Sequence, residues 1–383
     1  MKNYERKIYL NNAATSWPKP ACVGEAMGEA VKALPGSGGR GGIEEFDIFQ
    51  AVREELAEWL GISCPERIAL GCNSTWGLNQ GIFGFPLRPG DTVLTTRAEH
   101  NAVLRPLYRL EQQGIQVIYL DVDRTGRVSP EAWEKALDRF RPRLCVLIHA
   151  SNVTGAVNDA PRLTAAAHRY GAALLLDLSQ SLGWLPVELE DWEVDLAVFT
   201  GHKYLLGPQG TGGIYVRPGL ELKPYFLGGT GVQSDRREMP EEMPIHLEAG
   251  TGNEPSYHGL LAALRWSREH PREQEAGEAL LRYLKEGLKR LGCLVIEPEP
   301  PVTPVVSFGI PGISPGEAGD ILAGSYDIIC RTGLHCAPAI MENLEMPGGT
   351  IRLSLSRFTC REELDTVLEA VEAVRGICGR SEV

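Results

Sequence analysis

The sequence predicts an α/β protein, with a large domain built on a mostly parallel sheet and a smaller α+β domain after it. Short runs rich in Val, Ile and Leu alternate with helical runs between residues 67 and 200, as in parallel sheets whose strands are buried on both faces. The pattern changes near residue 255, where a long helical stretch leads to short strands and a final helix. A chain of 383 residues is long enough for about two domains. We expect the large domain at 20–260 and the small domain at 261–383, with 1–19 packing near the small one.

The strands of the large domain are placed where apolar residues are nearly continuous, and its helices where apolar residues recur every three or four positions. The expected strands are 67–70, 92–96, 116–120, 144–149, 172–177 and 196–200. The expected helices are 49–60, 75–83, 101–113, 130–140 and 161–170. Because strands and helices alternate, ligands should bind at the carboxyl ends of the strands.

The second half of the chain predicts one long helical stretch, four short strands and a last amphipathic helix. These elements are expected at 256–291, at 294–296, 305–308, 328–330 and 351–354, and at 362–374. Between the two halves, residues 228–250 are rich in charge, Gly and Pro and predict a long loop. Loops of this length in compact proteins are usually functional or disordered.

The composition narrows the classes of function. Lys and Arg number 38 against 50 Asp and Glu, a net charge of −12, which disfavours binding to nucleic acid or to an anionic membrane. The sequence has neither an apolar run long enough to span a bilayer nor the start of a signal peptide. Nine irregularly spaced cysteines predict free thiols in a reducing, cytoplasmic compartment. Gly is also frequent, with 43 residues, which indicates tight turns and ligand loops.

Two charged residues follow apolar strands at one edge of the expected sheet. Lys203 comes just after strand 196–200 in a glycine-rich turn. Most lysines are simply solvated, but one at a strand end suits a Schiff base with a carbonyl cofactor. Asp177 ends strand 172–177. It either caps a turn or, as a buried carboxylate, pairs with a cation such as the protonated ring nitrogen of pyridoxal phosphate.

Polar residues also follow two earlier strands. Ser74 and Thr75 are expected at a helix N-terminus, which is either an ordinary cap or an anion site for a phosphate. His100 follows strand 92–96. It is either a loop histidine with satisfied hydrogen bonds or an aromatic platform for the cofactor ring that also handles protons near neutral pH.

A thiol near the C-terminus has the neighbours of a nucleophile. In RTGLHCAP, Cys336 follows His335, with a glycine and Arg331 shortly before it. A nearby cation and a glycine hinge suit a mobile, reactive thiol, whereas most cysteines are buried structural residues. The spacing to Cys330 does not fit a metal site, and none is predicted. Arg331 and Arg352 are candidates for binding a substrate carboxylate.

Taken together, these motifs make the chain resemble the cysteine desulfurase family, within aminotransferase class V and the fold type I pyridoxal-phosphate enzymes. YLNNAATSWPKP and SGGRGGIE resemble the opening signature and the Arg-containing substrate loop. HASNVTGAVND, DLSQS, FTGHKYLLGPQGTG and EAGTGN are similar, in order, to cofactor motifs, and RTGLHCAP resembles the catalytic-Cys motif of the Suf-type subgroup. The resemblance runs nearly end to end and implies a seven-stranded large-domain sheet.

The resemblance also implies roles for individual residues. Lys203 would bind pyridoxal 5'-phosphate as a Schiff base, Asp177 would meet the ring nitrogen, Gln180 the phenolic oxygen, and His100 would stack on the ring. The phosphate would be held by Ser74, Thr75, Thr200, His202 and Thr251, the last from a second subunit of a homodimer. The substrate would contact Arg40, Asn152 and Arg352, with Arg331 near the thiol of Cys336.

The activity implied is the conversion of L-cysteine to L-alanine. The sulfur would pass to Cys336 as a persulfide and then to an acceptor protein, as in iron–sulfur cluster assembly. Three alternatives remain at this stage: a selenocysteine lyase acting on L-selenocysteine, another class V lyase or aminotransferase, and a catalytically silent cofactor-binding protein that presents a sulfur-assembly interface. A dinucleotide-binding dehydrogenase is disfavoured because no G-x-G-x-x-G follows the first strand.

Overall fold

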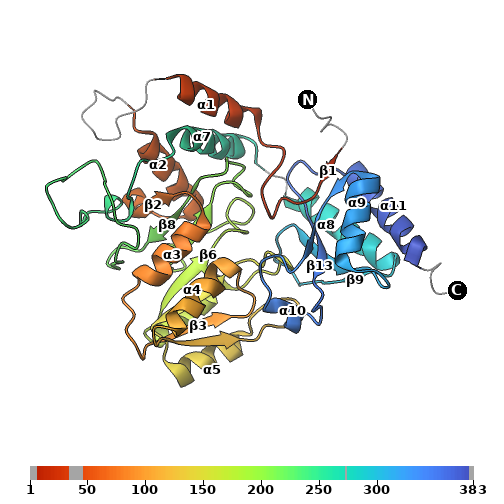
Figure 1. The fold of residues 1–383 in the computed structure, drawn as a ribbon, viewed down its shortest axis with the longest axis horizontal. Helices are drawn as coiled ribbons and strands as arrows, with labels where there is room; N and C mark the ends of the chain where they lie inside the picture. The colour runs from red at the N-terminus through yellow and green to blue at the C-terminus, as the bar shows by residue number, and fades with distance from the viewer. Residues whose placement is uncertain (1–6, 34–45, 272–273, 379–383) are drawn as a thin grey trace.

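A seven-stranded sheet forms the core of the larger part of the molecule, whose computed structural model describes residues 7–33, 46–271 and 274–378 (Figure 1). Its strand order is β2-β8-β7-β6-β5-β3-β4. The strands are β2 (Ile68–Gly71), β3 (Thr92–Thr96), β4 (Gln116–Leu120), β5 (Leu144–Ile148), β6 (Ala173–Asp177), β7 (Leu196–Thr200) and β8 (Gly212–Val216). Strands β3 to β7 are parallel to their neighbours within that group, while β8 is antiparallel to both β7 and β2. The predicted mostly parallel, seven-stranded sheet is therefore confirmed.

Strand β8 was not among the individually predicted strands, because its sequence GGIYV begins with two glycines that are unfavourable in strands. The structure shows why glycine is needed there. A Cβ atom on Gly212 would lie 2.8 Å from the Cα of Asn73, and one on Gly213 would lie 2.6 Å from the carbonyl oxygen of Ala69. The missing side chain of Gly212 thus lets the segment that caps helix α3 (Ser74–Gly84) lie directly on β8, and that of Gly213 allows close contact with β2.

Helices cover the sheet, and most of them start at the residue types that cap helices. Asp47, Asn73, Ser129 and Asp159 each accept a backbone N–H of the first turn of their helix. Helices α1 and α2 pack on α7 (Figure 1). The helices are α1 (Ala21–Lys32), α2 (Ile48–Leu60), α3 (Ser74–Gly84), α4 (Asn101–Glu111), α5 (Pro130–Phe140), α6 (Ala160–Arg169) and α7 (Glu254–Glu269). All but α1 lie where helical sequence was predicted.

The sheet has a crevice between β3 and β5. The chain moves from β3 outward to β4 and then returns to β5 on the other side of β3, so that the loops after β3 and β5 leave in opposite directions. The two strands pair only at Val93–Leu144 and Leu94–Cys145, although both continue further. Their carboxyl ends therefore separate, and ligands of open α/β sheets bind at such a point.

A second, smaller sheet has the order β12-β13-β10-β9. It packs in a core of its own, in which Phe308 and Leu353 are fully buried. Its elements are α8 (Gln274–Arg290), β9 (Leu294–Val295), β10 (Val305–Gly309), α9 (Pro315–Tyr326), β12 (Arg331–Gly333), α10 (Ile340–Asn343), β13 (Thr350–Ser354) and α11 (Arg361–Cys378).

The predicted single helical stretch at 256–291 is wrong, because α7 ends at Glu269 and α8 begins at Gln274. Pro271 explains the break: proline lacks a backbone N–H, and it disfavours helical geometry in the residue before it. The proposed division of the chain at 260/261 stays a prediction; that position lies inside α7.

The segment 8–16 connects both sheets. Strand β1 (Ile8–Tyr9) pairs in parallel with β11 (Ile328–Ile329), and Figure 1 shows it beside the C-terminal elements. Asn12 donates to the carbonyl of Ser354 at 2.9 Å, and the N–H of Ser16 donates to the carbonyl of His202 at 2.9 Å. The segment thereby links β13 to the turn that holds Lys203.

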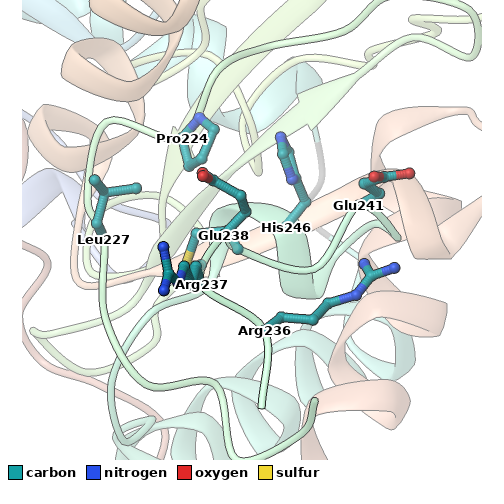
Figure 2. A pocket seen from close by; sticks show the side chains of 8 residues that line it. Pro224, Leu227, Arg236, Arg237, Glu238, Glu241 and His246 are labelled. Atoms are coloured by element: carbon teal, nitrogen blue, oxygen red, sulfur yellow. The ribbon is translucent and has the colours of Figure 1, made fainter. Parts of the chain in front are cut away.

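The predicted long loop at 228–250 has no strand or α-helix, only a short 3-10 turn at Ile245–Leu247. With the segment before it, this loop lines an open cavity of about 360 Å³ (Figure 2). None of the predicted site residues lines that cavity. None of the helices within the described ranges is both long and apolar enough to cross a bilayer.

Candidate active site

Lys203 and Asp177 lie at the same edge of the large sheet, as predicted. Asp177 is the last residue of β6, and Lys203 follows the neighbouring strand β7. Burial lowers the pKa of Lys203 to about 8, partly offset by the charge of Asp177. Burial also raises the pKa of Asp177, against hydrogen bonds from Ser179. An amine that is partly uncharged at neutral pH suits a Schiff-base lysine, and a buried carboxylate calls for a cationic partner.

Three of the five predicted phosphate residues, Ser74, Thr75 and Thr200, lie near the N-terminus of α3. This helix starts at Ser74 and Thr75, after the Asn73 cap, whose backbone lies against β8. Thr200, on β7, pairs in register with Gly212 of β8. Strand β7 and the start of α3 therefore lie on either side of the same residue of β8. Free N–H groups and the helix dipole make this N-terminus suitable for an anion.

His100 stands at the crevice and caps helix α4. Its Nδ1 accepts the N–H of Ala102 at 3.0 Å, so its proton lies on Nε2. Burial, reinforced by the charge of Lys203, lowers the pKa of His100 to about 4. The imidazole is therefore neutral at pH 7, which suits a stacking platform better than the predicted exchange of protons near neutral pH.

Glu99, next to His100, was missed by the sequence analysis. It is fully buried, and its Oε1 accepts the hydroxyl of Thr96 at 2.7 Å and the N–H of Ile148 at 3.0 Å. These partners end β3 and β5, so the Glu99 side chain bridges the strands where their ladder stops. In the sequence Glu99 stands in the stretch RAEH after strand 92–96, where nothing indicates a bridge between two strands.

Substituting Glu99 by Gln should change how stability depends on pH. Burial raises the pKa of Glu99 to about 8 from an ordinary 4.5. Between these values the folded chain keeps a proton that the unfolded chain has released, so rising pH favours unfolding. Glu99→Gln removes this effect. Urea unfolding is measured at pH 5, 6, 7 and 8. The free energy of unfolding of the variant, relative to that of the wild type, should increase with pH by at most about 1.4 kcal/mol per pH unit.

The exposed carboxylate of Glu54 on α2 supplies the control for this experiment, since it makes no contact with the crevice strands in the described structure. Glu54→Gln should keep a constant difference from the wild type across the same pH range. A constant difference for Glu99→Gln as well would show that Glu99 is not protonated in the folded protein.

Cys336 lies on a loop that reaches the crevice. Arg331 Nη2 donates to Cys336 Sγ at 2.9 Å. The carbonyl of Cys336 accepts the N–H of Asn101 at 2.7 Å, and the carbonyl of His335 accepts Asn152 Nδ2 at 2.8 Å. Asn101 follows His100, and Asn152 follows β5. These two hydrogen bonds therefore hold the backbone of the Cys336 loop next to His100 at the crevice.

Two arginines lie beside this thiol on neighbouring strands. Arg331 and Arg352 are paired in register across β12 and β13. Arg352 is 1% exposed and donates to the Asn152 carbonyl at 2.8 Å and to Asn11 Oδ1 at 3.1 Å. Burial, followed by the charge of Arg331, lowers the pKa of Arg352 to about 10. Two guanidinium groups on paired strands have the charge and hydrogen-bond donors that a carboxylate requires.

Two predicted residues are not joined to this group. Arg40 lies outside the described residues. Thr251 is exposed just before α7, and within the described structure no hydrogen bond links it to the other phosphate residues. Its predicted contribution to the phosphate site of a second subunit stays a prediction.

Buried polar atoms without a hydrogen bond test whether a cofactor fits here. Buried groups of this kind are rare and costly in folded proteins. Several in the described structure belong to the predicted site or adjoin it: Asn152 Oδ1, Gln180 Oε1, His202 Nδ1, Tyr204 OH and Arg352 Nε. A ring with a phenolic oxygen and phosphate, together with an amino-acid substrate, would supply partners for such atoms. The residues present therefore fit pyridoxal phosphate.

Residues 8–367 match the family model for Aminotransferase class-V. The chain belongs to the aminotransferase class V family. A probable cysteine desulfurase of Methanothermobacter thermautotrophicus is 31% identical over 97% of this chain and 95% of the relative. The cysteine desulfurase of Pectobacterium carotovorum subsp. carotovorum is 29% identical over 98% of this chain and 95% of the relative.

Solved structures agree with this class V assignment. The apo cysteine desulfurase from Thermococcus onnurineus NA1 superposes with a TM-score of 0.90 at 29% identity, covering 97% of this chain and 95% of that one. An Escherichia coli cysteine desulfurase in an S-sulfonic acid form superposes with a TM-score of 0.85 at 25% identity, covering 98% of this chain and 96% of that one. The fold is that of the fold type I enzymes, and the cofactor of this class V protein is pyridoxal 5'-phosphate.

Proposed function

We propose that the protein is a cysteine desulfurase, which converts L-cysteine to L-alanine and passes the sulfur, as a persulfide on Cys336, to an acceptor protein. One observation carries the proposal: Cys336 is held 2.9 Å from Arg331, on a loop fastened to Asn101 and Asn152 at the crevice of the sheet. A structural cysteine would need neither a cation beside its sulfur nor a position at the substrate site. The near full-length similarity to cysteine desulfurases supports the same conclusion.

The cofactor contacts follow from the strand ends and from the N-terminus of α3. Pyridoxal phosphate, when bound, supplies an electron sink for the pair released from the substrate Cα–H bond. Lys203 would hold the aldehyde carbon, Asp177 the ring nitrogen, and His100 one face of the ring. The remaining contacts would come from Gln180 at the phenolic oxygen and from Ser74, Thr75, Thr200, His202 and the partner subunit's Thr251 at the phosphate.

Lys203 is the group that we expect to move protons. Its pKa of about 8, lowered by burial, leaves part of the amine uncharged near neutral pH. With the cofactor and L-cysteine bound, the uncharged amine of Lys203 would take the proton from the substrate Cα. Asp177 would hold the protonated ring nitrogen of the cofactor, and that cation would compensate the burial of the carboxylate charge.

The substrate is held by its carboxylate while its sulfur faces Cys336. Arg352 and Asn152 would bind the carboxylate, and Arg40 would also contact the substrate. The Cys336 thiolate then attacks the substrate sulfur. An S–S bond forms as the C–S bond breaks, and the electron pair of the broken bond stays with the substrate carbon, which takes up a proton on the way to alanine. An acceptor thiol removes the sulfur from Cys336 afterwards.

The setting of the enzyme is part of the proposal. Contribution of Thr251 to a second phosphate site requires a homodimer. Eight of the nine cysteines are free thiols in the described structure, which supports a reducing, cytoplasmic compartment. An acceptor protein of iron–sulfur cluster assembly is the partner that we expect, and the negative net charge of −12 again disfavours nucleic acid.

Product analysis tests the proposal directly. The purified, cofactor-loaded protein is incubated with L-cysteine and a reducing thiol, and alanine, sulfide and pyruvate are quantified. Equal amounts of alanine and sulfide are expected, without pyruvate. Pyruvate as the main product would identify a sulfur-eliminating lyase instead. A parallel reaction with L-selenocysteine measures the preference between sulfur and selenium, and strong preference for selenium would identify a selenocysteine lyase.

A further inference from the structure

The turn that carries Cys336 has an unusual backbone. His335 and Cys336 are consecutive non-glycine residues with φ values of 51° and 58°, both in the left-handed region. L-residues avoid this region because of steric repulsion, and they keep it only where the surroundings hold them there. A pair of such residues, one of them the proposed nucleophile, therefore needs a structural cause.

The loop that carries Cys336 is held in place at both ends by packing. At its base, Gly333 and Gly349 approach so closely that a Cβ on Gly349 would lie 2.5 Å from the backbone of Gly333. At its far end, Ala337 and Ile340 are fully buried in the core of the large sheet. Between these fixed points, the N–H of Ala337 donates to the carbonyl of Leu334 at 2.9 Å and completes the turn.

The His335 side chain anchors this turn from inside. It is 1% exposed, and its Nε2 lies 2.8 Å from the hydroxyl of Thr350, the first residue of β13. Thr350 pairs in register with Gly333, so the imidazole is fastened to the closed base of the loop. The other ring nitrogen, Nδ1, is buried without a hydrogen bond. An apolar side chain would pack there at a lower cost, so packing alone does not account for a histidine.

We propose that His335 is a positioning residue for Cys336: its ring, bonded to Thr350, fixes the left-handed pair and so presents the thiol to Arg331 and to the substrate sulfur. This inference rests on the proposed cysteine desulfurase function. It assigns His335 no contact with substrate or cofactor and no proton transfer. Without the anchor, the turn relaxes to ordinary backbone angles and the sulfur leaves its place beside Arg331.

Three substitutions test the anchor on the full-length, cofactor-loaded chain. His335→Leu fills the space without a hydrogen bond, Thr350→Val removes only the hydroxyl, and His335→Gln keeps a polar group within reach of Thr350. His168→Leu is the matched control, because His168 is also hydrogen-bonded, to Asp195 at 2.8 Å, on a helix away from the loop.

We expect His335→Leu and Thr350→Val to lower kcat for L-cysteine on the order of 10- to 100-fold, the usual cost of misplacing a reacting group by about 1 Å. KM should stay within about twofold, and the change in cofactor absorbance on adding L-cysteine should persist, because the substitutions leave Lys203 and the carboxylate-binding Arg352 unchanged. Turnover of L-selenocysteine should fall far less, since selenium leaves more readily and depends less on the thiol. His335→Gln should restore most of the activity.

Hydrogen exchange at the Ala337 amide provides a readout independent of activity. Exchange should be at least about tenfold faster in His335→Leu and Thr350→Val and unchanged in His168→Leu, because opening of the turn exposes this amide. The proposal is overturned if His335→Leu keeps kcat within about twofold of the wild type. It is also overturned if turnover of L-cysteine and of L-selenocysteine falls in equal proportion, which indicates a general loss of structure. If the wild type releases no alanine, the proposed function fails, whereas the exchange measurement still decides whether His335 holds the turn.

Discussion

Lys203→Ala should lose the visible absorbance that the wild-type chain shows after loading with pyridoxal phosphate, and with it essentially all desulfuration. Lys203 is expected to be both the attachment point of the cofactor and the base at the substrate Cα. Losing a positioned general base alone costs about 10²–10⁴-fold in rate. The measurements are an absorbance spectrum after removal of free cofactor and alanine release from L-cysteine.

Lys285 on α8 provides the matched control for Lys203. It is a buried lysine whose pKa is also lowered by burial, but it belongs to the C-terminal part of the chain. Lys285→Met, which keeps the apolar stem, should retain the spectrum and the activity. A Lys203→Ala protein that still shows the full visible band would contradict the assignment of Lys203 as the attachment point.

Cys336→Ala should separate cofactor binding from sulfur transfer. The visible absorbance should match that of the wild type, because no strand-end residue of the cofactor site is changed. Alanine release from L-cysteine should fall by at least about 100-fold, since a free thiol in solution cannot replace one held at the substrate sulfur. Mass spectrometry of the wild type stopped in mid-turnover should find the additional sulfur on the Cys336 peptide.

Cys330 on the same part of the chain is the control for Cys336. It lies against the smaller core, and burial raises its pKa to about 11, so it is a poor nucleophile at neutral pH. Cys330→Ala should therefore keep its turnover of L-cysteine. Rapid alanine release by Cys336→Ala, or loss of it in Cys330→Ala, would remove the persulfide role from Cys336.

Much of the large sheet could be predicted from sequence because its physical signals are local. The strands at 92–96, 116–120 and 196–200 were placed to the residue, since each combines apolar and β-branched or aromatic residues in a short run. Strand β8 and helix α1 were missed in the sequence, each for its own reason. β8 starts with glycines that its close packing requires, and α1 has a weak apolar face and no polar cap.

The sequence predicted which residues form the candidate site, but not the hydrogen bonds between those that are distant in sequence. Lys203, Asp177 and Ser74 follow strands, and strand ends of a parallel sheet meet at one edge. The hydrogen bond from Arg331 to Cys336 joins residues that are close in sequence, so their spacing suggested this contact. Glu99 had no such sign, because its role is to bridge β3 and β5, and strand order is not written in the local sequence.

The pairing of β1 with β11 has a consequence for how the chain is made. Ile8 pairs with Ile328, so the early strand leaves the ribosome long before its partner exists. At about 5–20 residues per second, translation of the intervening chain takes roughly 15–60 s. During that time Asn12 and Ser16 have no way to link the two sheets, and the site around Lys203 is complete only at the end of synthesis. Assembly of this enzyme therefore cannot finish before its last strands are made, even if its large sheet folds early.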